Sequence, residues 1–531
     1  MYGDFSRVTY DPAKHYTSVL YQQGRVRLDA EDNELQAILR HTIRTALTEI
    51  IGDAATADNG FEISYDPSGG GALTIGAGSY YVDGIRVVNR PPDATLSYWQ
   101  QPYLLLDHDA STALPTSDFS VFLRVWERTV SPAQDPALRE VALGDLAPDT
   151  ALRGQVVWQV ITGPLVAESN ATRDEATANW PPAPSPALLM AQAIQPSPPS
   201  SPCEISPAAQ YRGPENQLYR VEVHTGGQPG TATFKWSRDN ASVTFPIVSL
   251  DDAVATVTTL GRDGKTALEV GDRVEIVDDR STLRLPGTAP QSLFEVVAID
   301  TLDLTVTLSS APGTTDASLH PILRRWDSPA PPVDDNGNPV TKDGALPIVE
   351  GQWQTLEDGV QVNFSRDAQD PDGDYVSGDY WLIPARVATG DVEWPRSVTG
   401  QPIPRAPKGI VYHYAPLANI SVANPDESDD LRSTFGHLAT RLDGKQAIQA
   451  PAPEPKPAAA RTATPTTPAP TTPAATPSAS ATSAAPTPGV GAPPVFSPLP
   501  GEPDPSVNPT AANRPEITPP VIFPGEPPAS A

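Results

Sequence analysis

The chain has 531 residues, 63 of them proline, and carries a formal net charge of −28 from 64 acidic and 36 basic side chains. A surface this negative repels phosphate groups, so the composition speaks against nucleic acid and anionic membranes as partners. The single cysteine, Cys203, excludes an intrachain disulfide, and no Cys/His spacing typical of zinc sites occurs.

The opening residues lack the pattern of a signal peptide, a basic segment followed by an apolar run. No uninterrupted apolar stretch reaches the roughly 18 residues that a membrane helix needs. We therefore expect a protein that is made in the cytoplasm and does not insert into a membrane.

Helix signals concentrate in residues 1–53. Asp11 followed by Pro12 predicts a helix start, and Gly24 is placed to end this short helix. A second helix is predicted with Asp29 as its cap, Asp32 near the positive end of its dipole, and Gly52 at its end. At 1.5 Å per residue this helix is about 33 Å long.

The second helix carries one apolar stripe, because its aliphatic residues recur at spacings of three and four. These residues are Leu35, Ile38, Leu39, Ile43, Leu47, Ile50 and Ile51. Two interpretations stay open. The stripe packs on the chain's own domain, or it packs against copies of itself or a neighbouring subunit and makes an assembly contact.

After Gly60 the apolar period changes to two, which predicts strands. Residues 73–87 predict a hairpin that turns at Asp83 and Gly84. Further strands are expected over residues 121–127, 155–161, 218–224, 232–237, 273–277, 302–308 and 378–383. Four tryptophans within them are expected to pack in cores rather than to hold ligands: Trp126, Trp158, Trp236 and Trp381.

Proline-rich breaks divide the chain into six predicted parts. These are a helical attachment segment (1–53), a first β domain (54–180), a proline-rich linker (181–203), a second β domain (204–330), a third β region (331–443) and a disordered Pro/Ala/Thr-rich tail (444–531). The tail has too little apolar surface to offset the entropy of ordering its backbone, so we expect it to stay extended.

No pattern in the chain predicts catalysis or a cofactor. The seven histidines are scattered, and the nucleophile, zinc-protease and phosphate-loop motifs are missing. Acidic pairs such as Asp278 and Asp279 are expected in surface turns, since sequence alone cannot place two carboxylates at a catalytic separation. We therefore expect no enzyme, no cofactor and no catalytic residue.

Residues 370–374 look like a calcium loop because their carboxylates alternate. They fail the EF-hand pattern, since Tyr375 stands at its glycine position and Trp381 at its bidentate glutamate position. Residues 334–338 fail similarly. We interpret both stretches as acidic turns and expect no metal site.

Two related segments in the tail, residues 493–503 and 519–527, contain its only aromatic residues. Each places apolar side chains in a polyproline context, which loses little entropy on docking. Their predicted docking residues are Val495, Phe496, Val521, Ile522 and Phe523. The alternative is a compositional coincidence within a low-complexity tract.

The chain resembles a family of uncharacterised bacterial proteins associated with phage-tail-like contractile injection systems. The resemblance rests on the opening GDFSRVTYDPAKHYTSVLYQQGRVRLDAEDNE and on later blocks such as VFLRVWERTV, LRGQVVWQVITG, FKWSRDNASV and GDYWLIPARVATGDVEWP. Together these blocks span most of residues 1–443. The opening is also similar to the N-terminal ends of phage baseplate and tail-fibre proteins, where such segments attach the protein to the particle.

We predict a mainly β, multi-domain fold with sandwich-like or barrel-like modules, an N-terminal helical segment and a disordered tail. The resemblance implies a structural, baseplate-associated component of an injection particle, whose partners are other baseplate, spike or sheath proteins. Because the parts of phage tails usually assemble as closed rings, we expect a homo-oligomer of three- or six-fold symmetry. The alternatives are a glycan- or receptor-binding module at the particle tip and, less favoured, a wall- or polysaccharide-degrading enzyme.

Overall fold

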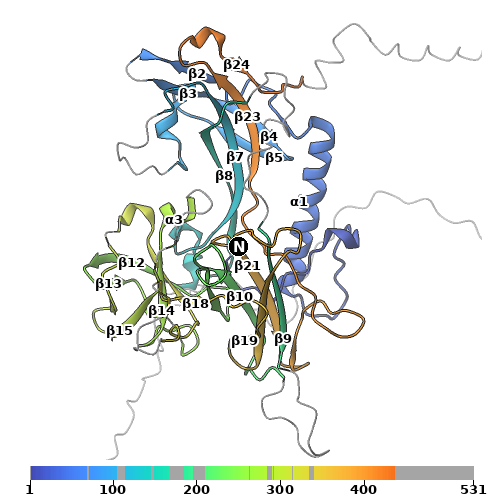
Figure 1. Ribbon diagram of the computed structural model, residues 1–531, viewed down its shortest axis with the longest axis vertical. Helices are drawn as coiled ribbons and strands as arrows, with labels where there is room; N and C mark the ends of the chain where they lie inside the picture. Colours follow the sequence, from blue (N-terminus) through green and yellow to red (C-terminus); the bar gives the residue numbers. More distant parts are fainter. Residues whose placement is uncertain are drawn as a thin grey trace, which may run out of the picture. The chain divides into compact units, whose positions relative to one another are not determined.

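The computed structural model describes residues 2–68, 71–104, 114–144, 149–166, 185–194, 210–261, 263–283, 290, 292–313, 315–333, 340–341 and 343–436. All of them belong to one compact unit. The fold is mainly β, with one long helix near the N-terminus, as the sequence predicted (Figure 1).

The long helix, α1 (Asp29–Ile51), is confirmed, and Gly52 follows its last residue with φ +97°. The predicted cap is wrong by one residue. Leu28 is the N-cap, and the carboxylate of Glu31 accepts a hydrogen bond from the Leu28 amide at 3.4 Å. Asp29 instead accepts a hydrogen bond from the Ser6 amide at 2.9 Å, which ties the preceding chain to the helix start.

The short helix predicted between Asp11 and Gly24 is only one 3-10 turn, η1 (Pro12–Lys14). The Asp11 carboxylate caps the Ala13 amide at 3.0 Å, as predicted. The turn ends at His15, whose φ of +54° is left-handed and stops the helix. We call residues 2–28, which precede α1, the N-terminal arm.

The first β body combines three sheets around one core. Their strands are β1 (Ala54–Ala55), β4 (Gly78–Val82) and β5 (Ile85–Asn89); β2 (Ile63–Asp66), β3 (Ala72–Gly76) and β6 (Thr95–Ser97); and β24 (Asp429–Asp430), β23 (His413–Ile420), β7 (Phe119–Val130) and β8 (Arg153–Gly163). The predicted hairpin is confirmed as β4 and β5. Asp83 and Gly84 take φ of +48° and +72° there, the paired left-handed conformation of a tight hairpin turn.

The second body is a sandwich of a five-stranded and a three-stranded sheet. The first contains β18 (Leu346–Pro347), β11 (Thr233–Ser237), β10 (Gln217–Val223), β21 (Tyr380–Arg386) and β22 (Asp391–Val392), and the second β19 (Gln354–Thr355), β20 (Val360–Arg366) and β9 (Ala187–Ala193). β9 lies within the predicted linker, residues 181–203, and all seven of its residues pair with β20. The linker prediction missed this strand because the flanking prolines dominate the local composition.

The third body is a closed six-stranded barrel. Its order is β12 (Thr244–Asp251), β13 (Val254–Val257), β16 (Thr305–Leu308), β15 (Phe294–Asp300), β14 (Arg273–Val277) and β17 (Ile322–Trp326). A short helix, α3 (Asp279–Leu283), follows β14. The barrel strands follow β11 and precede β18 in the chain, so the barrel is an insertion into the sandwich.

The sheets cross the domain boundaries that composition predicted. β7 pairs with β23, which lies about 290 residues later in the chain, and β10 pairs with β21. The barrel is therefore nested within the sandwich, and the sandwich within the first β body. The four strand tryptophans are all buried, with 0–4% of their surface exposed, as expected of core residues.

Candidate assembly surface

Helix α1 has two different faces. Ala30 and Ile38 are each 2% exposed and form its buried face, while Leu35 and Leu47 are half-buried beside it. Ile51 is also half-buried, and the remaining three stripe residues point to solvent: Leu39 is 47%, Ile43 58% and Ile50 73% exposed. The predicted stripe is thus split between the two faces.

The exposed residues Leu39, Ile43, Ala46 and Ile50 form one line, which we call the seam. Their spacings of four, three and four residues keep them within a band of roughly 60° around the helix. The centre of this band is roughly 110° from Ile38 and 170° from Ala30. The spacing is that of the contact stripe in helix–helix packing.

Charged and close contacts fix the orientation of α1. Arg40 and Arg44 both pair with Glu127 of β7, at 3.5 and 2.7 Å, and α1 runs beside the long sheet of β7, β8 and β23 (Figure 1). In the β4–β5 turn, a Cβ on Gly84 would lie 2.3 Å from the carbonyl oxygen of Arg44. The helix and the turn are therefore in direct backbone contact, and the seam is held facing outward.

The N-terminal arm is also fastened along its length. The Thr9 hydroxyl donates to Glu34 of α1 at 2.5 Å. Arg386 donates to the Ser6 carbonyl at 2.8 Å, and Arg7 pairs with Glu393 at 3.2 Å. These contacts attach the arm to both α1 and the sandwich.

The arm begins in a cluster of buried charges that we call the anchor cluster: Arg220, Glu222, Lys235 and Glu275. Arg220 and Glu222 lie in β10, Lys235 in β11 and Glu275 in the barrel strand β14. Glu222 accepts from Arg220 Nε at 2.6 Å, and Lys235 bridges Glu275 at 2.7 Å and Glu222 at 3.4 Å. The cluster therefore links the sandwich to the barrel.

Tyr2 closes this cluster. Its hydroxyl donates to Glu222 at 3.2 Å, and its ring lies 4.1 Å from the Arg220 guanidinium and 3.8 Å from that of Arg324. Next to it, the Gly3 carbonyl accepts from the Asn240 amide group at 2.8 Å. The first residues of the arm thus contribute to the packing between two bodies.

The charges of the anchor cluster compensate one another. Burial alone would raise the pKa of Glu222, but the neighbouring Arg220 and Lys235 charges overcome it and lower that pKa to about 2. His224, at the end of β10, is 1% exposed, and neither ring nitrogen has a hydrogen-bond partner among the described residues. Burial and then the Lys235 charge lower its pKa to about 4.

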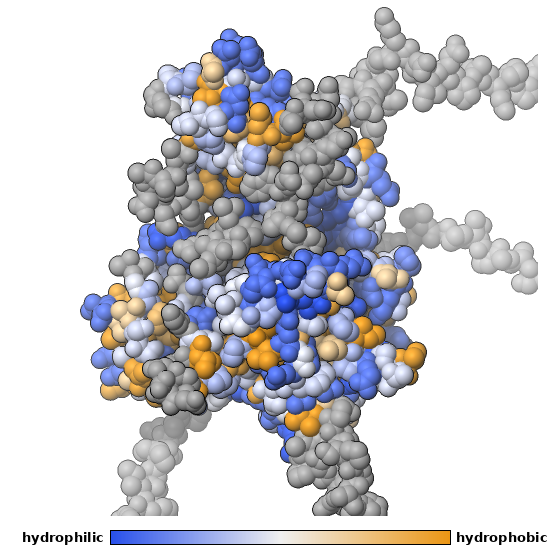
Figure 2. Space-filling model, viewed as in Figure 1, coloured by the Kyte–Doolittle hydropathy of each residue, from blue (hydrophilic) through white to orange (hydrophobic). Residues whose placement is uncertain are grey.

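Apolar side chains are also exposed on the arm itself. Val8, Tyr16, Leu20, Val26 and Leu28 are between 46% and 82% exposed. On the face of the molecule in Figure 2, apolar residues otherwise lie in small patches among hydrophilic ones. The arm and the seam together therefore make residues 8–50 the candidate surface for assembly.

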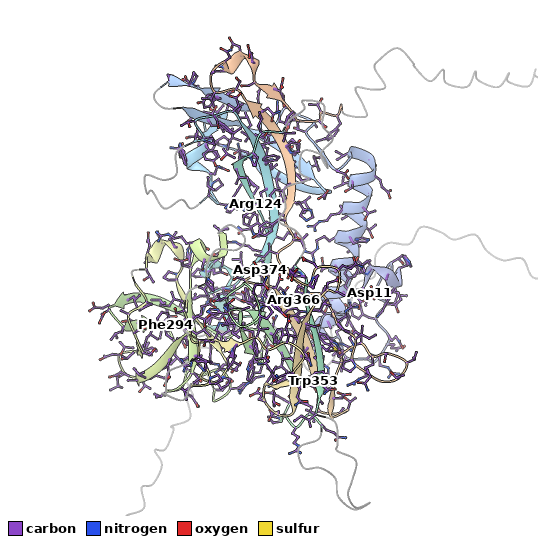
Figure 3. All side chains as sticks on the ribbon, in the orientation of Figure 1. Asp11, Arg124, Phe294, Trp353, Arg366 and Asp374 are labelled. Atoms are coloured by element: carbon purple, nitrogen blue, oxygen red, sulfur yellow. The ribbon has the colours of Figure 1, made fainter. Side chains whose placement is uncertain are left out.

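The other predicted site residues are placed differently. The tail residues Val495, Phe496, Val521, Ile522 and Phe523 lie outside the described residues. The calcium-like loop is held by protein donors: Gln228 donates to Asp374 at 2.7 Å, and Arg366 to the Gly373 carbonyl at 3.2 Å (Figure 3).

The described part of the chain holds neither a metal-binding cluster nor a membrane-spanning helix. No group of three or more His, Cys, Asp or Glu side chains there is arranged to hold a metal ion. None of its helices combines the length and apolar character needed to cross a membrane.

The anchor cluster and the two faces of α1 were not predicted from the sequence. Arg220 and Glu222 alternate with apolar residues in a predicted strand, which is the usual pattern of a sheet with one face in water. Both faces of β10 are in fact buried. The four-three-four spacing of the seam was present in the sequence, but only the docking of Ala30 and Ile38 separates the seam from the buried face.

A model of a family of unknown function, DUF6519, matches residues 1–178 and 182–493. No curated protein matches the chain, and neither does any solved structure. Because the two matched ranges cover well over half of the 531 residues, the chain belongs to the DUF6519 family.

Proposed function

We propose that the protein is a structural, baseplate-associated component of a contractile phage-tail-like injection particle, and not an enzyme. The resemblance of its opening and later blocks to proteins from such systems suggests the particle. The attachment role is supported by the seam, which is an uncharged apolar line on the side of α1 opposite its docked face. A solvent-facing apolar line on a firmly held helix is typical of a surface that another protein covers.

The size of the seam indicates what kind of contact it makes. Covering the exposed parts of Leu39, Ile43 and Ile50 contributes on the order of 4 kcal/mol per helix. Two such faces give about 8 kcal/mol, which the loss of free motion on association, about 4–15 kcal/mol, largely offsets. The seam is therefore too small for a tight free dimer, and suits one contact among many in a closed ring.

The neighbours in such a ring are copies of this chain, in three- or six-fold symmetry, held on other baseplate components. The seam carries no charged side chain, although the chain as a whole has a net charge of −28. A neighbouring copy that packs on the seam therefore meets no like charge there. The exposed apolar residues of the arm add to the same contact.

The first experiment asks whether the protein is part of the particle. Sheathed particles are purified from the wild-type strain and from a strain that lacks the gene, and both are examined by mass spectrometry and electron microscopy. We expect the protein in stoichiometric amount and density missing at one end of the particle in the deletion strain. Intact particles that do not contain the protein would overturn the proposal.

A further inference from the structure

A cavity of about 700 Å³ lies between the N-terminal arm and the segment that follows β22. Its walls include Arg7 and Lys14 from the arm, and Arg405 and Lys408 from the sandwich side. Trp394 and Tyr10 also line it. The volume is in the range of small-molecule sites, which combine apolar walls with a few polar groups.

The charges that line this cavity do not cancel. Four cations face two carboxylates, and both carboxylates are already engaged. Glu393 pairs with Arg7 at 3.2 Å and with Arg386 at 3.1 Å, while Asp11 caps the Ala13 amide. The side chains of Arg405 and Lys408 make no hydrogen bond or ion pair with any residue that the structure describes.

The backbone holds these two free cations in place. Arg405 exchanges hydrogen bonds with Leu189 of β9, at 2.9 and 3.0 Å, and Lys408 with Tyr380 of β21, at 2.7 and 2.8 Å. The Arg405 carbonyl also accepts from the Trp381 indole at 2.8 Å. The backbone of both cations is thus held against two strands of the sandwich, whereas their exposed side chains become ordered only when a ligand binds.

The two cations also disfavour each other. Partial desolvation, and then the positive charge of Arg405, lower the pKa of Lys408, although its side chain stays accessible to solvent. A bound anion offsets the repulsion between the two positive charges. In a chain with a net charge of −28, such a local excess of positive charge is the exception.

The aromatic side chain of Trp394 on the cavity wall favours a ligand that contains a ring. Trp394 is half-buried against the sandwich core and its indole donates to the Ile403 carbonyl at 2.9 Å, which fixes the ring at the cavity. Pro12 and Pro395 lie beside it. A flat apolar wall next to two cations suits a ring that carries an acid group, as in an acidic sugar.

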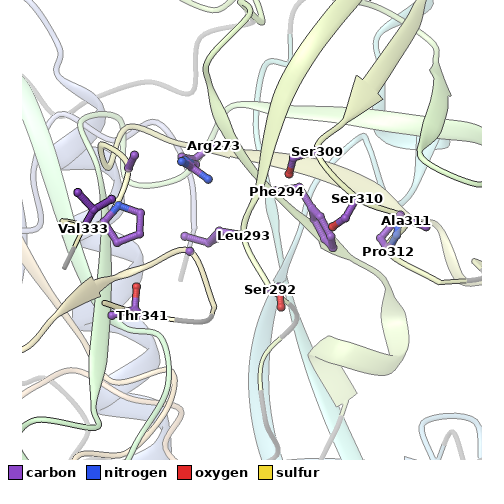
Figure 4. Close-up of a pocket in the computed structure, with 13 residues that line it drawn as sticks. Arg273, Ser292, Leu293, Phe294, Ser309, Ser310, Ala311, Pro312, Val333 and Thr341 are labelled. Carbon is purple, nitrogen blue, oxygen red and sulfur yellow. The ribbon is translucent and has the colours of Figure 1, made fainter. Parts of the chain in front are cut away.

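A second cavity, of about 510 Å³ at the barrel, lacks these features. Arg273 is its one lining cation among the described residues (Figure 4). This side chain already pairs with Glu295 at 3.1 Å. Its other walls are largely serine, proline and aliphatic residues. No free charge there is left for a ligand.

We propose that the cavity between the arm and the sandwich binds an acidic saccharide, with Arg405 and Lys408 holding the carboxylate or sulfate group and Trp394 contacting the sugar ring. Arg supplies two parallel donors to such an acid group, and Lys a compact charge. This binding role does not depend on the seam, although Val8 of the arm belongs both to the cavity wall and to the candidate assembly surface.

The test uses the full-length protein and calorimetry with four defined ligands: a polygalacturonate oligosaccharide, a sulfated oligosaccharide, a neutral oligosaccharide of the same length, and sodium sulfate. We expect binding of at least one acidic oligosaccharide, and affinity for the neutral one and for free sulfate at least about tenfold weaker. The two acidic ligands distinguish carboxylate from sulfate recognition. An affinity for the neutral sugar equal to that for the acidic ones overturns the proposal, and so does tight binding of sulfate alone.

Two double variants separate this site from general electrostatic attraction. Arg405→Gln with Lys408→Gln removes two positive charges at the cavity, and Arg86→Gln with Arg90→Gln removes two exposed ones at β5. The cavity variant is expected to bind about tenfold or more weakly, and the β5 variant within about twofold of wild type. Equal losses in both, or no loss in either, contradict the proposal. Circular dichroism and the thermal midpoint confirm that both variants are folded.

Discussion

The first residues of the chain and helix α1 differ in how their side chains are buried. Tyr2 and Gly3 are inserted among buried charges, where Glu222 and Asn240 bond to them. Helix α1 buries Ala30 and Ile38 but leaves Leu39, Ile43 and Ile50 in solvent. The buried residues attach the N-terminal segment to the rest of its own chain, and the exposed residues are available to a neighbouring protein. Substitutions in the first set should change stability, and substitutions in the second should change assembly.

The largest expected effect is loss of a charge from the anchor cluster. Glu222→Gln leaves Arg220 and Lys235 buried without their common carboxylate, so we expect a loss of about 3–5 kcal/mol in the free energy of unfolding. The matched control is Asp32→Asn, since the Arg27–Asp32 pair is exposed, at 66% and 46%, and such pairs contribute less than about 1 kcal/mol. Denaturant unfolding measures both. Equal losses would show that the cluster does not anchor the arm.

The two faces of α1 give the next contrast. Ile38→Ala removes a side chain that is 2% exposed and should cost about 2–4 kcal/mol. Ile43→Ala, at a side chain that is 58% exposed, should change stability by less than about 0.5 kcal/mol. Thermal and denaturant unfolding measure the stability of the two variants. If Ile43→Ala destabilised the purified protein as much as Ile38→Ala, the seam would be part of the chain's own core.

The pH dependence of stability tests whether His224, beside the anchor cluster, is buried in its neutral form. Its pKa is lowered from 6.5 to about 4 in the folded protein, so below pH 6.5 the unfolded chain takes up a proton that the folded chain does not. His224 therefore reduces stability as the pH falls from 6.5 to 4, by about 3 kcal/mol in total. Asp379 and Glu357 oppose this trend, since burial raises both of their pKa values to about 6.

The difference between wild type and His224→Leu isolates the histidine from those carboxyls. The stability of the variant relative to wild type should rise by about 3 kcal/mol between pH 6.5 and pH 4. Unfolding by denaturant at a series of pH values measures it. A difference that does not depend on pH would mean that His224 is protonated, or solvated, in the folded protein.

The smallest predicted difference between two paired variants concerns the contact between α1 and the β4–β5 turn. Gly84→Ala meets both a left-handed φ of +72° and the Arg44 backbone, whereas Gly24→Ala meets a similar φ of +70° with open space around it. Both variants carry the cost of the left-handed conformation, about 1–2 kcal/mol. Gly84→Ala should cost a further 1–2 kcal/mol or so, because the helix must shift. Similar thermal midpoints for the two variants would argue against close docking of α1.

Local patterns predicted the local elements of this fold well. The end of α1 at Gly52 and the turn at Asp83 and Gly84 follow from glycine's backbone freedom, which acts over a few residues, whereas the predicted N-cap of α1 was wrong by one residue. The four buried tryptophans follow from strand periodicity. The nesting of the barrel, the sandwich and the first β body could not be predicted from local patterns. The pairing of β7 with β23 joins segments about 290 residues apart, and neither sequence identifies its partner strand.

The candidate site was predicted only in part. The stripe residues were identified, but periodicity could not show that Ile38 is covered while Ile43 is not. The anchor cluster escaped notice because charged residues alternating along β10 normally indicate a face in water. Deletion of residues 1–52, an obvious test of assembly from the sequence, also removes Tyr2 from that cluster. Point variants in the seam are therefore the better test.

The assembly role of α1 is tested most directly by measuring how much of the double variant Leu39→Asp with Ile43→Asp is incorporated into particles. The control is Leu302→Asp, at an apolar side chain of the barrel that is 92% exposed. Quantitative mass spectrometry of purified particles compares both with wild type. We predict that the seam variant folds with an unchanged thermal midpoint but is depleted from particles at least about tenfold, while the control is incorporated normally. Normal incorporation of the folded seam variant would contradict the assembly role of α1.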